Sequence, residues 1–184
     1  GEPAGWKPMS HDYYNKHIFK PLMQRLGISY LAVAFADEGI VLREKGITMP
    51  IVVLNADAGS FDKMIAHSLQ PEIYSFHSLE DFVLSVERYG AHGYPIHIKL
   101  DTGMHRLGFV AEEVDELISR LKDNRSIRVA SVFAHLACAD DPTQDDFSRE
   151  QISLFDALSR RIVDAMPYEV IRHMANSAAI ERLP

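Results

Sequence analysis

Short apolar segments with the pattern of β-strands alternate with helix-like segments along most of this chain. Strand-like patterns cover residues 30–35, 50–54, 72–76, 95–101, 127–135 and 169–174. Helix-like periodicity covers residues 37–45, 60–69, 78–89, 111–122 and 144–164. A strand–helix–strand order repeated this regularly implies right-handed crossovers and a parallel sheet. We therefore expect a single α/β domain over residues 1–184.

Start and stop signals support several of these helices. Ser60 and Ser78 are predicted N-caps, and Gly46 is a predicted stop after the helix over residues 37–45. Ser78 and Asp81 have the spacing of a capping box, although Glu or Gln is more usual than Asp at the second position. These signals place the start of one predicted helix at residue 78.

The composition limits both the size of the core and the class of partner. With 184 residues, of which 47% are hydrophobic and 24% charged, the chain can bury one core, as soluble domains do. Its net charge of -7 argues against nucleic acid or an anionic membrane as a partner. The single cysteine, Cys138, excludes an internal disulfide and a cysteine-based zinc site, which fits a reducing cytoplasmic compartment. No apolar run is long enough to span a bilayer, and we assign no metal ligands.

Two parallel architectures, an open doubly wound sheet and a closed barrel, are compatible with the alternation. The chain lacks the Gly-x-Gly-x-x-Gly turn of dinucleotide-binding sheets and the glycine-rich loop that binds nucleotide phosphates. Polar residues instead end three successive strands, at Lys99, His135 and His173. In TIM-type barrels the reacting groups lie at this end of the strands. We therefore expect an α/β fold of the (β/α)8 TIM type that is incomplete, because only about six of the eight strands are found.

The strand that ends at Asp101 alternates between apolar and ionisable residues. The apolar side chains at 96, 98 and 100 are expected on one face, and His97, Lys99 and Asp101 on the other. A glycine turn that carries Arg106 follows. Ionisable groups gathered at a strand end indicate a functional site. The alternative is an edge strand with one face in water, and the pattern alone does not decide between them.

Three segments in this order resemble the pyridoxal-phosphate-dependent alanine racemases. They are K-L-D-T-G-M-H-R-L-G at residues 99–108, V-F-A-H-L-A-C-A-D at 132–140 and H-M-A-N-S-A-A at 173–179. The resemblance extends from about residue 27 to residue 184 and is most specific at the first segment. The sequence at residues 34–38 and 76–81 is similar to that of racemase domains fused to a cell-wall peptide ligase.

The resemblance implies a barrel domain that uses pyridoxal 5'-phosphate to interconvert L- and D-alanine for peptidoglycan synthesis in the cytoplasm. It also implies a homodimer in the full-length protein, with alanine as the small-molecule substrate. In racemisation the cofactor is the electron sink, and the protein supplies bases, orientation and electrostatics. Two alternatives remain open, a non-catalytic barrel that carries pyridoxal phosphate and an amino-acid decarboxylase on the related barrel.

The resemblance assigns roles to two cationic residues, Arg106 and Lys99. Arg106 matches the arginine that hydrogen-bonds the phenolic oxygen of the cofactor. Lys99 matches a lysine that is often carbamylated and holds this arginine in place. A carbamate would pair with a guanidinium, whereas an unmodified lysine would repel it. The alternative is an unmodified Lys99 paired with Asp101, and the sequence leaves both open.

Four further residues are implied to contact or support the cofactor. His135 matches the histidine that packs against the pyridine ring, and its alternative is a core histidine at a strand end. Asn176 and Ser177 match the turn that holds the cofactor phosphate, and their alternative is a simple helix N-cap. His173 matches a histidine that supports an arginine on the ring nitrogen of the cofactor, and this arginine is expected beyond residue 184.

Two acid–base groups of the family have no match in this sequence. The lysine that forms an aldimine with the cofactor normally lies in a V-K-A-x-A-Y-G segment, and the surroundings of Lys7 do not match it. The second base is a tyrosine from a C-terminal β domain, and we expect this domain and the first and last barrel strands to lie outside this sequence. Residues 1–24 depart from the family, and Tyr13, Tyr14, Phe19, Leu22 and Met23 suggest an amphipathic helix packed on the barrel. We therefore expect residues 25–184 to be a racemase-like core that does not racemise alanine alone.

Overall fold

Six parallel strands form one sheet, in a computed structural model that describes residues 20–182. The strands lie in the sheet in their order along the chain, so each pairs with the next. They are β1 (Leu31–Val33), β2 (Ile51–Val53), β3 (Gln70–Ile73), β4 (Tyr94–Lys99), β5 (Ile127–Phe133) and β6 (Ile171–His173). The parallel sheet expected from the alternation is confirmed.

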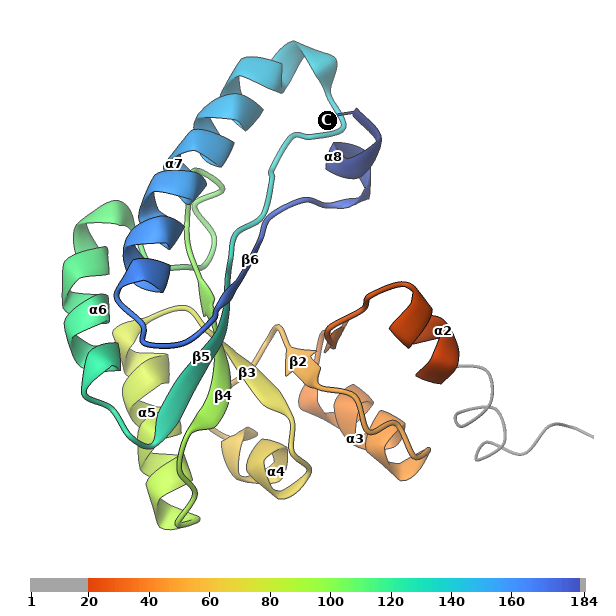
Figure 1. Ribbon diagram of the computed structural model, residues 1–184, viewed down its shortest axis with the longest axis vertical. Helices are drawn as coiled ribbons and strands as arrows, with labels where there is room; N and C mark the ends of the chain where they lie inside the picture. The colour runs from red at the N-terminus through yellow and green to blue at the C-terminus, as the bar shows by residue number, and fades with distance from the viewer. Residues whose placement is uncertain (1–19, 183–184) are drawn as a thin grey trace, which may run out of the picture.

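The helices that connect the strands lie along one face of this sheet. The sheet is curved, and its other face is the concave one (Figure 1). The bounds of the α-helices are α2 Lys20–Arg25, α3 Ala36–Glu44, α4 Phe61–Ala66, α5 Phe76–Arg88, α6 Val114–Lys122, α7 Asp145–Asp164 and α8 Ser177–Arg182. Two 3-10 turns, η2 (Ala111–Glu113) and η3 (Pro142–Gln144), precede α6 and α7. The result is a curled half-barrel, an incomplete TIM-type barrel as expected.

Residues 1–19 lie outside the described part of the chain, and so do the predictions for Lys7, Tyr13, Tyr14 and Phe19. Leu22 of the predicted amphipathic helix lies on α2 and is exposed. Among residues 20–182, no helix has the length and apolar character needed to cross a membrane.

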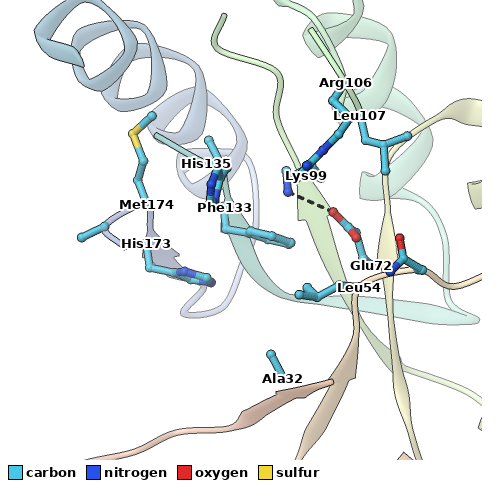
Figure 2. A pocket seen from close by; sticks show the side chains of 13 residues that line it. Ala32, Leu54, Glu72, Lys99, Arg106, Leu107, Phe133, His135, His173 and Met174 are labelled. Carbon is cyan, nitrogen blue, oxygen red and sulfur yellow. Dashed lines mark ion pairs between the residues drawn. The ribbon is translucent and has the colours of Figure 1, made fainter. Parts of the chain in front are cut away.

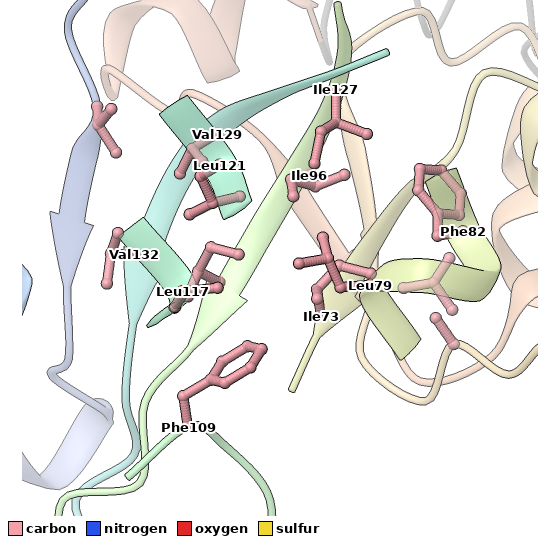
Figure 3. Close-up of a cluster of buried hydrophobic side chains, with 14 of the residues drawn as sticks. Ile73, Leu79, Phe82, Ile96, Phe109, Leu117, Leu121, Ile127, Val129 and Val132 are labelled. Carbon is pink, nitrogen blue, oxygen red and sulfur yellow. The ribbon is translucent and has the colours of Figure 1, made fainter. Parts of the chain in front are cut away.

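The apolar core lies between the outer face of the sheet and the helices (Figure 3). Ile96, Ile98 and Leu100 are at most 1% exposed and contribute to it. The strand that carries them, β4, is paired on both sides, so the alternative of a solvent-exposed edge strand is wrong. Its polar residues therefore face the inside of the curl, where His97 is 1% exposed.

A β-bulge on β5 determines which side chains face inward. Ile96 pairs with Val129, but His97 pairs with Ser131, so Ala130 is an additional residue on β5. Val129 before the bulge is buried in the apolar core. Beyond the bulge, Ser131 lies on the inner face and bonds to the His97 ring. The bulge thus rotates the end of β5 toward the inside of the barrel.

The helix boundaries agree only in part with the sequence signals. Gly46 adopts a φ of +83° just after α3, as predicted for a stop. The capping box predicted at Ser78 and Asp81 is wrong, because Ser75 is the N-cap of α5 and Ser78 is its third residue. Phe76 belongs to the helix and not to the preceding strand, which moves the cap three residues earlier.

Candidate functional site

A cavity of about 470 Å³ lies at the carboxyl ends of the strands, on the inner side of the curl (Figure 2). Every strand of the sheet or the residues directly after it contribute to its wall. The lining residues are Ala32, Leu54, Asn55, Glu72, Lys99, Arg106, Leu107, Phe133, Ala134, His135, His173, Met174 and Ala175. This is the end of a parallel barrel at which reacting groups are expected.

A nearly buried ion pair joins β3 to β4 inside this cavity. Lys99 Nζ lies 3.1 Å from Glu72 Oε1, and the side chains are 12% and 2% exposed. Burial raises the pKa of Glu72, and the positive charges of Lys99 and Arg106 oppose this rise. The proposed pairing of Lys99 with Asp101 is wrong, because Asp101 accepts hydrogen bonds from the backbone of Gly103 and His105.

Glu72 is the residue that the sequence analysis missed. The available signal was its place at the start of the predicted strand over residues 72–76, between Pro71 and Ile73. A carboxylate is rarely buried without a partner of opposite charge. A buried Glu on one strand therefore indicates a cation on its neighbour.

Aromatic rings surround the other side of the Lys99 ammonium. Nζ lies 4.6 Å from the centroid of the Phe133 ring, in the geometry of a cation–π contact. The Phe133 ring in turn stacks on His173, with the centroids 5.1 Å apart and the planes 5° from parallel. Loss of hydration lowers the pKa of His173, and the charge of Lys99 lowers it further, which favours a neutral ring.

Arg106 lies on a loop that returns to β4. Leu100 forms a β-bridge with Phe109, and Asp101 Oδ1 accepts hydrogen bonds from Gly103 N at 2.9 Å and His105 N at 3.0 Å. Gly108 has a φ of +130°, and a Cβ there would lie 2.5 Å from the nitrogen of Asp101. Only glycine therefore fits at this position, and the loop conformation points Arg106 toward Lys99 (Figure 2).

The Arg106 guanidinium forms no hydrogen bond or ion pair with any residue in the range 20–182. Its five N–H donors are therefore available to a ligand in the cavity. His135 lines the same cavity. Desolvation lowers the pKa of His135, and the charges of Lys99 and Arg106 add to this effect, so the uncharged ring is favoured near neutral pH.

A second group of polar side chains lies on the same strands, two residues before the cavity residues Glu72, Lys99 and Phe133. His97 Nδ1 is 2.7 Å from Ser131 Oγ, and His97 Nε2 is 2.8 Å from Gln70 Oε1. Tyr30 packs against the His97 ring, and its hydroxyl contacts both Ser131 and His173. Burial lowers the pKa of His97 to about 3, and the nearby His173 contributes to the shift.

Asn176 and Ser177 lie at the start of α8, directly after the cavity residue Ala175. Asn176 Oδ1 accepts a hydrogen bond from Ala179 N at 3.0 Å, and its Nδ2 donates to the carbonyl of Leu136. Asn176 therefore makes the contact of an N-cap residue. The structure brings Arg106, Lys99, His135 and His173 to one cavity, whereas Asn176 and Ser177 do not line it.

The fold and this cavity define a TIM-type barrel protein whose site lies at the carboxyl ends of the strands. Residues 14–184 match the family model described as "Alanine racemase, N-terminal domain". The chain is 35% identical to the alanine racemase of Sorangium cellulosum over 193 aligned positions, and 36% identical to that of a Geobacter species over 168. This chain belongs to the alanine racemase family.

Solved structures agree with this assignment. The alanine racemase of Clostridium difficile 630 is similar with a TM-score of 0.77 and 31% identity, over 88% of this chain and 42% of that protein. The matches to the Sorangium and Geobacter enzymes cover 100% and 86% of this chain, but 50% and 43% of theirs. The chain therefore spans about half the length of these relatives.

Proposed function

We propose that this chain forms the pyridoxal-phosphate-binding barrel of an alanine racemase. The observation that carries the proposal is the meeting of Arg106, His135 and His173 in one cavity at the carboxyl ends of the strands. The three residues belong to three separate segments of the sequence, and the family resemblance predicts each of them as a cofactor contact. The names of the relatives support alanine as the substrate.

The cavity fits the cofactor in size and in chemistry. A volume of about 470 Å³ lies within the range of pockets that take small organic ligands. The free guanidinium of Arg106 suits an anionic oxygen such as the phenolic oxygen of the cofactor. When bound, pyridoxal phosphate withdraws electrons from the α-carbon of an amino acid, which makes the α-proton easier to remove.

The residues of the chain would hold and orient the cofactor. Arg106 donates hydrogen bonds to an anionic oxygen, and the loop closed by Asp101 and Gly108 keeps its position. His135 supplies a neutral ring surface, and Phe133 and Met174 exclude water from the wall. Asn176 and Ser177 stay predicted phosphate contacts, one and two residues beyond the cavity wall.

The two groups that would move the α-proton have no match in these 184 residues. We therefore assign to this chain the cofactor cavity, and we expect the proton-transferring lysine and tyrosine to come from outside it. A complete enzyme of this kind, a cytoplasmic homodimer, would supply D-alanine for peptidoglycan. The purified chain is accordingly expected to show no alanine racemase activity.

The test is a titration of the purified chain with pyridoxal phosphate, followed by borohydride reduction and peptide mapping. Borohydride reduces any lysine–aldehyde adduct to a stable bond. We expect saturable binding at the cavity without one specifically labelled lysine, because the covalent lysine has no match in this chain. A single reduced lysine, for example Lys7, would show a complete anchoring site and contradict this assignment. Absence of saturable binding would contradict the proposed cofactor cavity itself.

A further inference from the structure

Glu72 is a buried carboxylate of the cavity, and its charge depends on the residues around it. Glu72 is 2% exposed and lies on β3, in register with His97 on β4. It is the only carboxylate among the described residues that line the cavity. Apart from Lys99, no donor in residues 20–182 bonds to its Oε1 atom. A buried carboxylate with one partner depends on that partner for its charge to be tolerated.

Two groups beside Lys99 Nζ favour a positive charge. Its Nζ lies 3.1 Å from Glu72 Oε1 and 4.6 Å from the centroid of the Phe133 ring. The face of an aromatic ring carries negative electrostatic potential, so it attracts an ammonium and repels an anion. The carboxylate and the ring therefore favour the same charge state of Lys99 through two independent contacts.

Carbamylation would reverse the charge at this position. In that reaction the neutral amine of Lys99 attacks the carbon of CO2, a C–N bond forms, and one proton is released. The product is an anionic carbamate. Here its oxygens would lie against the buried carboxylate of Glu72 and next to the ring face of Phe133. Two adjacent anions in a buried site repel each other strongly. An ammonium paired with a carboxylate also lacks the free lone pair that the attack on CO2 requires.

We propose that Glu72 is a positioning residue that holds Lys99 as an unmodified ammonium and supplies the fixed anion of the cavity. In this role it replaces the carbamate that the family resemblance implied for Lys99. The two cations, Lys99 and Arg106, then face the cavity, and Glu72 beside Lys99 is the one carboxylate among the described residues that line it (Figure 2). The proposal goes beyond the proposed function, because it concerns the charge of Lys99 in the chain itself, with or without a cofactor.

The first test uses the unmodified protein. NMR of the chain labelled with 15N at lysine Nζ, in buffer that contains 13C-bicarbonate, reports the ammonium and the carbamate separately. We expect an ammonium signal that is lost in Lys99→Arg, and no 13C carbamate signal that depends on Lys99. A carbamate signal in the wild-type protein that disappears in Lys99→Arg would overturn the proposal.

The second test removes the carboxylate and keeps its shape. In Glu72→Gln the anion is gone, so we expect a 13C carbamate signal to appear and to be abolished by an added Lys99→Arg. Glu72→Asp is expected to restore the wild-type pattern. The matched control is Glu80→Gln, which breaks an exposed ion pair with Arg120 and should leave Lys99 unmodified. A folded Glu72→Gln protein without carbamate would also contradict the proposal. If that variant does not fold, the wild-type signals decide.

Discussion

Two layers of side chains occupy the inner face of the sheet, and they differ in how completely their polar groups are paired. The deep layer consists of Gln70, His97 and Ser131, and the rim layer consists of Glu72, Lys99 and Phe133, two residues further along the same strands. In the deep layer both His97 nitrogens have hydrogen-bond partners and the group is uncharged. The rim layer contains two buried or nearly buried charges and borders the free guanidinium of Arg106.

The comparison shows that burial alone does not identify a functional site. Both layers contain buried polar groups, but only the rim layer holds charged groups that line a cavity, next to the free donors of Arg106. A satisfied neutral network fixes the sheet at little electrostatic cost. A charged group without a protein partner is available to a ligand. Burying such a charge usually lowers the stability of the fold.

The largest expected effect is the loss of one partner of the rim ion pair. Glu72→Leu should lower the free energy of unfolding by roughly 3 to 5 kcal/mol, because it leaves the Lys99 charge nearly buried without a counter-ion. Lys99→Met should cost a similar amount. The double variant Glu72→Leu/Lys99→Met should cost much less than the sum. Urea denaturation of all four proteins completes this double-mutant cycle, and additive effects would show that the two charges do not stabilise each other.

The next effect is acid sensitivity from the deep layer. Unfolded His97 takes up a proton near pH 6.5, whereas in the fold its pKa is about 3. Stability is therefore unaffected above about pH 6.5 and falls by up to about 1.4 kcal/mol per pH unit as the pH drops toward 3. Denaturation at several pH values should show a shallower slope for His97→Gln. The exposed His77→Gln is the control, and an equal slope in His97→Gln and the wild type would refute the assignment.

The smallest expected effect on stability comes from Arg106. The side chain is exposed and has no protein partner within residues 20–182, so Arg106→Ala should change the free energy of unfolding by less than about 0.5 kcal/mol. Affinity for pyridoxal phosphate should fall about tenfold or more, because a hydrogen bond to a charged group is lost. Arg149→Ala on α7 is the control for a general loss of positive charge. Unchanged affinity in Arg106→Ala would remove Arg106 from the cofactor site.

The sequence predicted those parts of the molecule that depend on local patterns. The period-2 alternation of β4 placed His97 and Lys99 on the face opposite the apolar core, and the family segments led to Arg106, His135 and His173. The partner of Lys99 could not be predicted in this way, because it lies on another strand and depends on the register between β3 and β4.

The same limit explains the misplaced start of α5. Phe76 is apolar and follows an apolar strand, so its pattern fits either element. The choice is made by the hydrogen bond from the backbone of Ser78 to the Ser75 side chain, together with burial of Ser78. Tertiary packing, rather than the spacing of polar residues, therefore decides which serine is the cap.

The β-bulge at Ala130 means that the faces of β5 cannot be counted by strict alternation from its first residue. Val129 and Val132 both belong to the apolar core, although they are three positions apart. Strict alternation from Val129 would place Ser131 in the core and Val132 inside the curl. Ala130 takes up the extra position, so Ser131 and Phe133 stand beside His97 and Lys99 on the inner face. A count of every second residue along β5 therefore misassigns each side chain after Val129, including the ring beside Lys99 and the partner of His97.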